Sequence, residues 1–413
     1  MISLTPRQAK TPKFEQNREQ LLVGAALLFN EHGVKGATLA DVAEFAGLSL
    51  KSIRYYFQRK EDLVAECFQR SIAVYAGIAA TAAREATPRE RVRVLLAEFM
   101  QLSTRVRRGE HAPFLHFGDI RAVDGMADGP VGSAYTAMFR RYRALLGPAP
   151  RGLVERQRMN ARAHLLLSEL LWAVVWIWRY EDDQLPRLAA HMQRVFEHGL
   201  LGSVAAWEPA AQQVIEAAAA SDSPKNTYLR AATALINELG YRGASIDRIS
   251  AKLGLTKGAF YHHHEAKDDL VVACFERSFD VMKAAQVDMA KGLAAGAEPL
   301  ASRQLCAMVT QLAHYQLGPL GPLLRTSALM AVPPAIRVQM ARRMDAISSR
   351  FNDVLTDGVV QGSVAPLDTA IGAQMLTGMV NSIAELPLWV AGADGPLALE
   401  LYARPLFIGL FED

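Results

Sequence analysis

The residues with the most obvious potential for chemistry are three consecutive histidines, His262-His263-His264, followed by Glu265. Imidazole and carboxylate groups bind zinc and also transfer protons in catalysis. However, consecutive side chains on a helix point about 100° apart, so adjacent histidines do not easily share one ion. A histidine-dependent metalloenzyme is therefore one hypothesis for this chain, and the elements around the histidines must decide whether it stands.

A second group of possible ligands lies in HAPFLHFGD, residues 111–119, which contains His111, His116 and Asp119. The two histidines are five residues apart with a proline between them, which is poor spacing for a metal site on a helix. We interpret them as surface or pocket histidines. The three cysteines, Cys67, Cys274 and Cys306, form no CxxC pair and suit a reducing compartment. We therefore expect no metal, no cofactor, no catalytic residue and no enzymatic activity.

The chain of 413 residues contains an internal duplication. Residues 18–72 align with residues 225–279 at a constant offset of 207, and about a third of the positions are identical. Both copies contain NE-x-G-xx-GA, then G-L, then K-x-DLV-xx-CF-x-RS. The period is far too long for a solenoid, so the pattern indicates a duplicated domain.

Each copy has the pattern of several short helices. In the first copy, Thr38 can cap a helix with Asp41 three residues later, and that helix ends at Gly47. Ser49 is placed to cap the next helix, in which Ile53 and Phe57 lie one turn apart and are expected to face the core. A helix, a tight glycine turn and a second short helix form a helix-turn-helix, a motif that binds DNA.

Charge supports this interpretation. The stretch 49–60 carries Lys51, Arg54, Arg59 and Lys60 and no acidic residue, which suits contact with phosphates. A short basic helix is often only a solvated surface, but a duplicated, capped and glycine-turned unit favours DNA binding.

Both copies resemble the DNA-binding domain of TetR-family transcriptional regulators. In the second copy LTKGAFYHH (255–263) matches the family pattern closely, whereas SLKSIRYYF (49–57) matches it more loosely. The resemblance implies an all-α fold with two helix-turn-helix domains, each followed by a helical domain for ligand binding and dimerisation. The expected boundaries are 14–72 and 225–279 for the DNA-binding domains, 73–201 and 280–413 for the regulatory domains, and 202–224 for the linker.

The resemblance also implies which residues contact DNA. Phosphate contacts fall to hydroxyl, imidazole and amine groups in each copy, and base contacts to the start of each recognition helix. The expected set in the first copy is Thr38, Ser49, Leu50, Lys51, Arg54, Tyr55, Tyr56 and Lys60. In the second copy it is Ser245, Thr256, Lys257, Gly258, Tyr261, His262, His263 and Lys267, which makes two of the histidines phosphate ligands. His264 replaces Phe57 of the first copy, where the family has a buried aromatic ring.

Ordinary family members read two half-sites as a homodimer, whereas this chain resembles a pseudo-dimer joined in one polypeptide. Segments 163–180 and 186–201, with 368–390 and 396–411, are expected to form the four-helix interface. Two independent modules, each pairing with another chain, remain the alternative. Because Leu50-Lys51 and Lys257-Gly258 differ chemically, the expected operator has two unlike half-sites.

The family resemblance further implies a repressor that a small molecule releases from DNA. Six residues are either the lining of an effector pocket or ordinary core, namely Phe114, His116, Tyr135, Phe139, Trp172 and Trp176. The effector itself is not identified by any residue. The polar N-terminus has no apolar signal sequence, and the apolar run at 165–178 is too short for a membrane span, so we expect a cytoplasmic protein without membrane contact. An architectural DNA-binding protein with weak sequence specificity is the main alternative.

Overall fold

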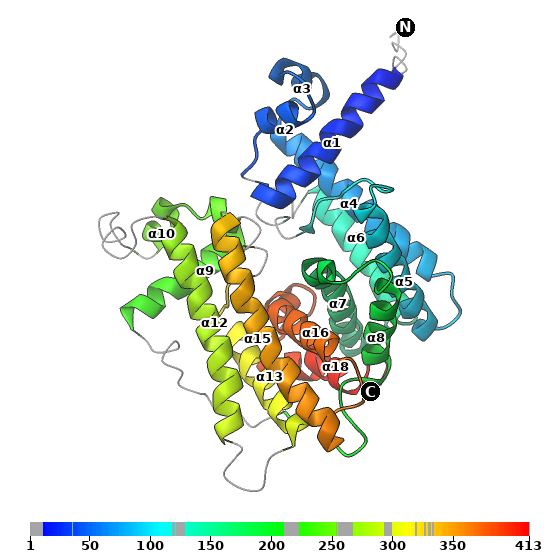
Figure 1. Ribbon diagram of the computed structural model, residues 1–413, viewed down its shortest axis with the longest axis vertical. Coiled ribbons are helices and arrows are strands. Elements are labelled where there is room, and N and C mark those ends of the chain that lie inside the picture. The colour runs from blue at the N-terminus through cyan, green and yellow to red at the C-terminus, as the bar shows by residue number, and fades with distance from the viewer. Residues whose placement is uncertain are drawn as a thin grey trace.

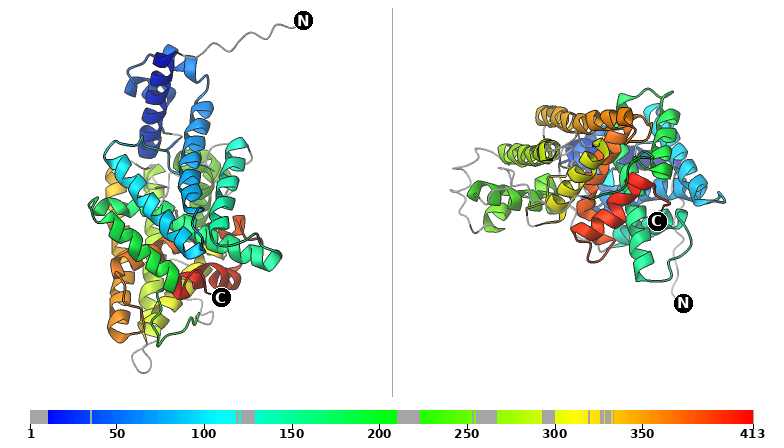
Figure 2. Two further views of the ribbon diagram at one scale, coloured as in Figure 1. Left: turned by 90° about the vertical axis from the view of Figure 1, so that its right-hand side faces the viewer. Right: turned by 90° about the horizontal axis from the view of Figure 1, so that it is seen from below.

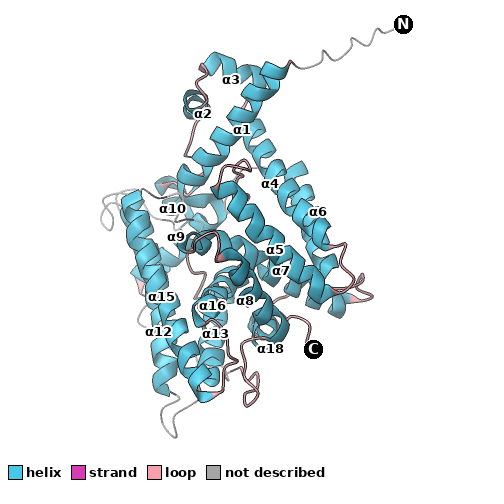
Figure 3. Ribbon diagram, turned by 45° about the vertical axis from the view of Figure 1, so that its right-hand side comes forward, coloured by secondary structure: helices cyan, strands magenta, loops and turns pink. Residues whose placement is uncertain are grey.

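The computed structural model describes most of the chain. The described residues are 11–34, 36–117, 120, 129–209, 223–252, 254, 267–292, 300–318, 320–325, 328, 332 and 334–412. Over these residues the regular structure is helical, and two residues, Leu201 and Val364, form an isolated β-bridge (Figure 3). The fold is therefore all-α, as the sequence predicts.

The first DNA-binding region consists of α1 (Pro12–His32), α2 (Leu39–Phe45), α3 (Leu50–Tyr56) and the start of α4 (Lys60–Ala82). These helices project from one end of the molecule (Figure 1). The predicted caps are confirmed, because Thr38 and Asp41 form a reciprocal capping box and the Ser49 side chain accepts from the Ser52 amide. Gly47 takes a φ of 66° in the turn between α2 and α3, a conformation that favours glycine.

Helix α4 continues without a break from the DNA-binding region into the first regulatory region. There it packs on α5 (Pro88–Arg107) and α6 (Pro130–Leu145). The chain then continues into α7 (Leu153–Trp176), a 3-10 turn η2 (Ile177–Arg179) and α8 (Leu185–His198). The expected domain boundary at 72/73 thus lies inside one helix. The two parts share a rigid element, which means that movement of one end of α4 carries the other.

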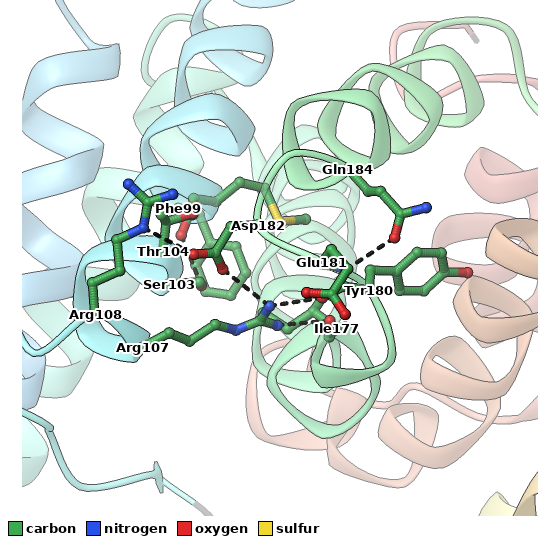
Figure 4. Close-up of polar contacts among 11 residues, drawn as sticks. Phe99, Ser103, Thr104, Arg107, Arg108, Ile177, Tyr180, Glu181, Asp182 and Gln184 are labelled. Atoms are coloured by element: carbon green, nitrogen blue, oxygen red, sulfur yellow. Dashed lines mark hydrogen bonds and ion pairs between the residues drawn. The ribbon is translucent and has the colours of Figure 1, made fainter.

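The end of α5 is tied to the turn after α7. Arg107 donates from Nη1 to the Tyr180 carbonyl at 2.8 Å and from Nη2 to the Ile177 carbonyl at 2.7 Å (Figure 4). The Arg108 Nε donates to the Asp182 carboxylate at 2.9 Å. Carbonyls at the end of a helix have no partner within it, so the Arg107 guanidinium caps α7 and η2 from a neighbouring helix, and Arg108 adds an ion pair with the Asp182 side chain.

The second half repeats the order of helices. It contains α9 (Pro224–Gly243), α10 (Ile246–Lys252), α12 (Lys267–Gly292), α13 (Ala301–Leu317), α15 (Pro334–Gln361), α16 (Thr369–Ser382), η4 (Ile383–Leu388), α17 (Gly395–Ala398), the π-helical turn η5 (Leu399–Ala403) and α18 (Arg404–Ile408). Like α4, α12 runs through the expected boundary at 279/280 into the regulatory region.

The two halves pack against each other through the four segments that the sequence singles out. α7 lies against α16 and η5, and α8 lies against α16 and α18. Figure 1 labels α7, α8, α16 and α18, and Figure 2 shows the molecule from two further sides. Across the contact, the Asn160 amide donates to the Trp389 carbonyl at 2.8 Å, and the ring of Phe139 stacks on that of Trp389 with 3.6 Å between centroids. The α7–α16 approach is close at Gly378, where a Cβ atom would lie 2.6 Å from the Trp172 ring.

Backbone bonds reinforce this contact. The Leu201 amide donates to the Phe407 carbonyl at 2.9 Å, and the Ala365 amide donates to the Leu200 carbonyl at 2.9 Å. The start of the expected linker is also docked, since the Trp207 ring lies 4.7 Å from that of Phe407 and Glu208 pairs with Arg303 at 3.1 Å.

One stretch, 153–179, has the length and composition of a membrane-crossing helix, but 72% of its apolar window is buried inside the protein. Its exposed apolar side chains are few and include Val175 and Trp178. The burial follows from its central position between α6, α16 and η5, which confirms the prediction of a core helix in the run 165–178.

Candidate nucleic-acid interface

Helix α3 is held by its apolar face and presents a polar one. Ile53 and Phe57 are 0% and 4% exposed, as predicted, and anchor the helix against the core of the first copy. Leu50, Lys51 and Arg54 are exposed on the other face, next to the capping residue Ser49. The amide end of a helix and two cations on one outward face can bind phosphates and reach base edges in a major groove.

Lys51 and Arg54 make no ion pair with any described residue, whereas Arg59 on the following turn is paired with Asp62 at 2.8 Å. This pairing raises the pKa of the Arg59 guanidinium and lowers the pKa of the Asp62 carboxyl, mainly through the hydrogen bond between them. Lys51 and Arg54 on α3 therefore present positive charge that no described carboxylate neutralises.

Two tyrosines at the end of α3 lie against the start of α1. The Phe14 ring is 5.7 Å from that of Tyr55 and 4.7 Å from that of Tyr56, and the Asn17 amide donates to the Tyr56 hydroxyl at 3.0 Å. Tyr55 is nevertheless 77% exposed, so its hydroxyl is available to a phosphate. The N-terminal helix thus fixes the two side chains that are expected to grip the backbone.

The remaining expected residues of the first copy have partners of their own. The Thr38 amide donates to the Asp41 carboxylate at 2.7 Å, and this bond lowers the pKa of Asp41. The Lys60 ammonium lies 5.9 Å from the centre of the Phe29 ring, in cation–π range, and is half-buried. Both residues flank α3, but Lys60 is less available to DNA than the sequence alone indicates.

In the second copy only part of the expected interface lies within the described residues. Ser245 accepts from the Arg248 amide at 3.3 Å at the start of α10, in the position that Thr38 has in the first copy. Lys267 begins α12. The predictions for Thr256, Lys257, Gly258, Tyr261, His262, His263 and His264 fall outside the described residues. Among the described residues, no group of three or more His, Cys, Asp or Glu side chains is arranged to hold a metal ion.

The family comparison matches both copies. The model of the bacterial regulatory proteins of the tetR family matches residues 21–67 and again residues 229–274. The two matched regions of this chain are thus DNA-binding domains of the tetR family type. The helix-turn-helix unit in each of them is a motif that binds DNA.

Curated relatives match this chain over a stretch of the size of one such unit. The Transposon Tn10 TetC protein of Escherichia coli is 43% identical over 63 residues, which is 14% of this chain and 32% of the relative. The HTH-type transcriptional dual regulator CecR of Shigella flexneri is 43% identical over 61 residues, 15% of this chain and 27% of the relative. The chain thus spans about a third of the length of these relatives.

Solved structures that resemble this chain each cover less than half of it. The TetR-family regulator PfmR from Thermus thermophilus has a TM-score of 0.38 and 20% identity, over 44% of this chain and 98% of that one. Apo AibR has a TM-score of 0.37 and 19% identity, over 44% of this chain and 97% of that one.

The residues expected to line a pocket separate into two groups. Phe114 and Tyr135 belong to an aromatic cluster with Tyr75, Phe117 and Trp389, and Phe139 joins it by stacking on Trp389. His116 lies beside Phe114, and desolvation lowers the pKa of its imidazole to about 4, so the ring is neutral. In contrast, Trp172 packs at Gly378 on the contact between the halves, and Trp176 packs on Tyr180.

Sequence reasoning missed the polar tie between the DNA-binding and regulatory regions. The Asn30 side chain, on α1, donates to the Phe114 carbonyl at 2.9 Å and accepts from the His116 amide at 2.9 Å. Asn237 does the same in the second half, to the Leu323 carbonyl and from the Arg325 amide, both at 2.9 Å. The NE pair that both copies share was the signal available in the sequence. The asparagine of this pair makes the same two hydrogen bonds in each copy.

Proposed function

We propose that this TetR-family protein is a sequence-specific repressor that binds DNA as a covalently linked pseudo-dimer and is released by a small-molecule effector. The two DNA-binding domains occupy 14–72 and 225–279, the regulatory domains 73–201 and 280–413, and the linker 202–224. As a regulator bound to DNA, the protein acts in the cytoplasm.

The contact between the halves carries this proposal. Within one chain, α7 and α8 pack on α16, η5 and α18, and backbone hydrogen bonds join Leu200 and Leu201 to the other half. In a homodimer of family members, each subunit contributes one pair of these helices to the contact. A chain that already fills this contact with its own second half has no need of a second chain to place two recognition helices.

The second half also supports the position of the first DNA-binding domain. Arg337, on α15, donates from Nη2 to the Glu31 carbonyl at 2.7 Å, which caps the end of α1. Arg179 of the first half forms an ion pair with Asp345, which also lies on α15. The first recognition helix is therefore oriented by contacts from both halves.

The route from an effector to DNA follows from the shared helices. α4 and α12 run from the regulatory regions into the DNA-binding domains, and Asn30 and Asn237 fasten α1 and α9 to loops of the regulatory regions. A ligand that prefers one arrangement of those loops changes the separation of the two recognition helices, and DNA binding changes by the same coupling free energy.

Specificity tests the proposal most sharply. Selection of duplexes from a random pool, followed by single-base substitution of the selected site, should give two half-sites with different sequences and different mismatch penalties of about 1–3 kcal/mol each. Uniform affinity for all sequences would identify a non-specific architectural binder. A perfect palindrome with equal penalties in both arms would contradict the proposed pseudo-dimer with unlike half-sites.

A further inference from the structure

The two copies differ in how they neutralise the same arginine. In the first copy Arg70, on α4, forms a bidentate pair with Glu19 on α1, with 2.8 Å between Nη1 and one carboxylate oxygen. Glu66 lies one turn earlier on α4 and pairs with Arg18. Two cations and two carboxylates thus balance between α1 and α4.

The second copy keeps the arginine and loses the carboxylates. Arg277 corresponds to Arg70, but Asn226 stands in the place of Glu19 and Ala273 in the place of Glu66. Lys225 keeps the positive charge of Arg18. The region between α9 and α12 therefore carries the cations of the first copy without their anions.

Arg277 is also buried, with 4% of its surface exposed. Its Nη2 donates to the Leu320 carbonyl at 2.6 Å, while Nε and Nη1 are buried and have no hydrogen-bond partner among the described residues. Burial lowers the pKa of this guanidinium, and the nearby Arg230 adds repulsion, yet an arginine stays charged in proteins. A buried cation with unpaired donors is strongly unfavourable, and no described carboxylate pairs with this one, so an anion would complete the site.

We propose that Arg277 is the anion-binding group of an effector site in the second half, and that its ligand is a small carboxylate with an apolar body. Arginine pairs with carboxylates through charge-assisted hydrogen bonds. Cys274 and Tyr315, which interact electrostatically with Arg277, are buried, at 0% and 2% exposure, and offer an apolar environment to the rest of the ligand.

The site is coupled to the DNA-binding domain through one loop. Arg277 holds this loop at Leu320, and Asn237 of α9 holds it at Leu323 and Arg325. A carboxylate that takes the guanidinium from Leu320 releases one of these ties and shifts the loop that positions α9. The role as an effector site rests on the proposed ligand-controlled function, whereas binding of the anion does not.

The test measures thermal unfolding of the full chain with sodium benzoate, with neutral benzamide of the same shape, and with sodium chloride at equal ionic strength. Benzoate should raise the melting temperature by about 3 °C at ten times its dissociation constant, and benzamide should not. Arg277→Gln should abolish the rise. The matched variant Arg70→Gln, whose arginine already has Glu19, should keep it.

A carboxylate built into the chain gives a readout that needs no ligand. Ala273→Glu places one a helical turn before Arg277 and should raise the melting temperature and block the benzoate response, but it should not stabilise the Arg277→Gln protein. The absence of any benzoate effect, an equal effect in Arg277→Gln, or equal effects of Ala273→Glu in both backgrounds would overturn the site. Operator binding is measured separately, so loss of DNA binding alone would refute the proposed function and leave the anion site standing.

Discussion

The tie at Asn30 makes a quantitative prediction about how firmly the first DNA-binding domain is fastened. Asn30→Ala removes two hydrogen bonds of 2.9 Å, one to the Phe114 carbonyl and one from the His116 amide. Each such bond contributes about 1 kcal/mol net, and the partly buried backbone groups left unpaired add to the cost. We expect a loss of about 2–4 kcal/mol in the free energy that holds α1 on the loop at 114–116.

Hydrogen exchange at the His116 amide measures this loss directly, because its protecting acceptor is the Asn30 side chain. The expected increase in exchange rate is about 30-fold or more, since about 1.4 kcal/mol corresponds to a factor of ten. Asn30→Asp is the matched control, because its carboxylate still accepts from His116 but cannot donate to Phe114, and it should lie between parent and Asn30→Ala. Asn237→Ala should expose the Arg325 amide in the same way. Unchanged protection at His116 in Asn30→Ala, with the protein folded, would refute the reasoning.

Three further predictions concern DNA reading, pH and the histidine cluster. Lys51→Ala should weaken operator binding and remove about 1–3 kcal/mol of base discrimination from one arm of the site only, as measured with base-substituted duplexes; equal loss in both arms would argue against an asymmetric operator. Burial raises the pKa of Glu169 well above its ordinary 4.5, so the folded state keeps a proton that the unfolded state loses, and stability should fall as pH rises above 4.5 towards the raised pKa. Glu169→Gln should therefore be the more stable protein at pH 8 and lose that slope in denaturant titrations, and a slope that persists would assign it to another group. His264→Phe restores the aromatic residue of the first copy, so its melting temperature should be equal or higher with operator affinity unchanged, and a clear loss of binding would show that His264 contacts DNA.

The helix-turn-helix was predictable from sequence because its determinants are local. Thr38 with Asp41, Ser49 with the Ser52 amide, and Gly47 in the turn each act within a few residues, so their types and spacing are enough to place the caps. The buried positions of Ile53 and Phe57 follow in the same way from helical periodicity.

The long-range ties were not predictable, because their partners lie far apart in the chain. Nothing local to Asn30 indicates a bond to residues 114 and 116, and nothing in α7 indicates that Trp172 meets Gly378. The aromatic residues at 114–139 and 172–176 share a composition typical of a ligand pocket, but the tertiary packing places Trp172 and Phe139 at the contact between the halves, on Gly378 and Trp389. The difference between the environments of Arg70 and Arg277 likewise becomes visible only when the two copies are compared in three dimensions.

We propose above that one chain supplies both DNA-binding domains of the functional unit. Sedimentation equilibrium of the full chain, alone and with the selected operator, measures how many chains each particle contains. We expect one chain per particle in solution, and one chain per duplex at all concentrations that saturate the operator. Two chains per duplex, or a dimer that must form before DNA binds, would contradict it.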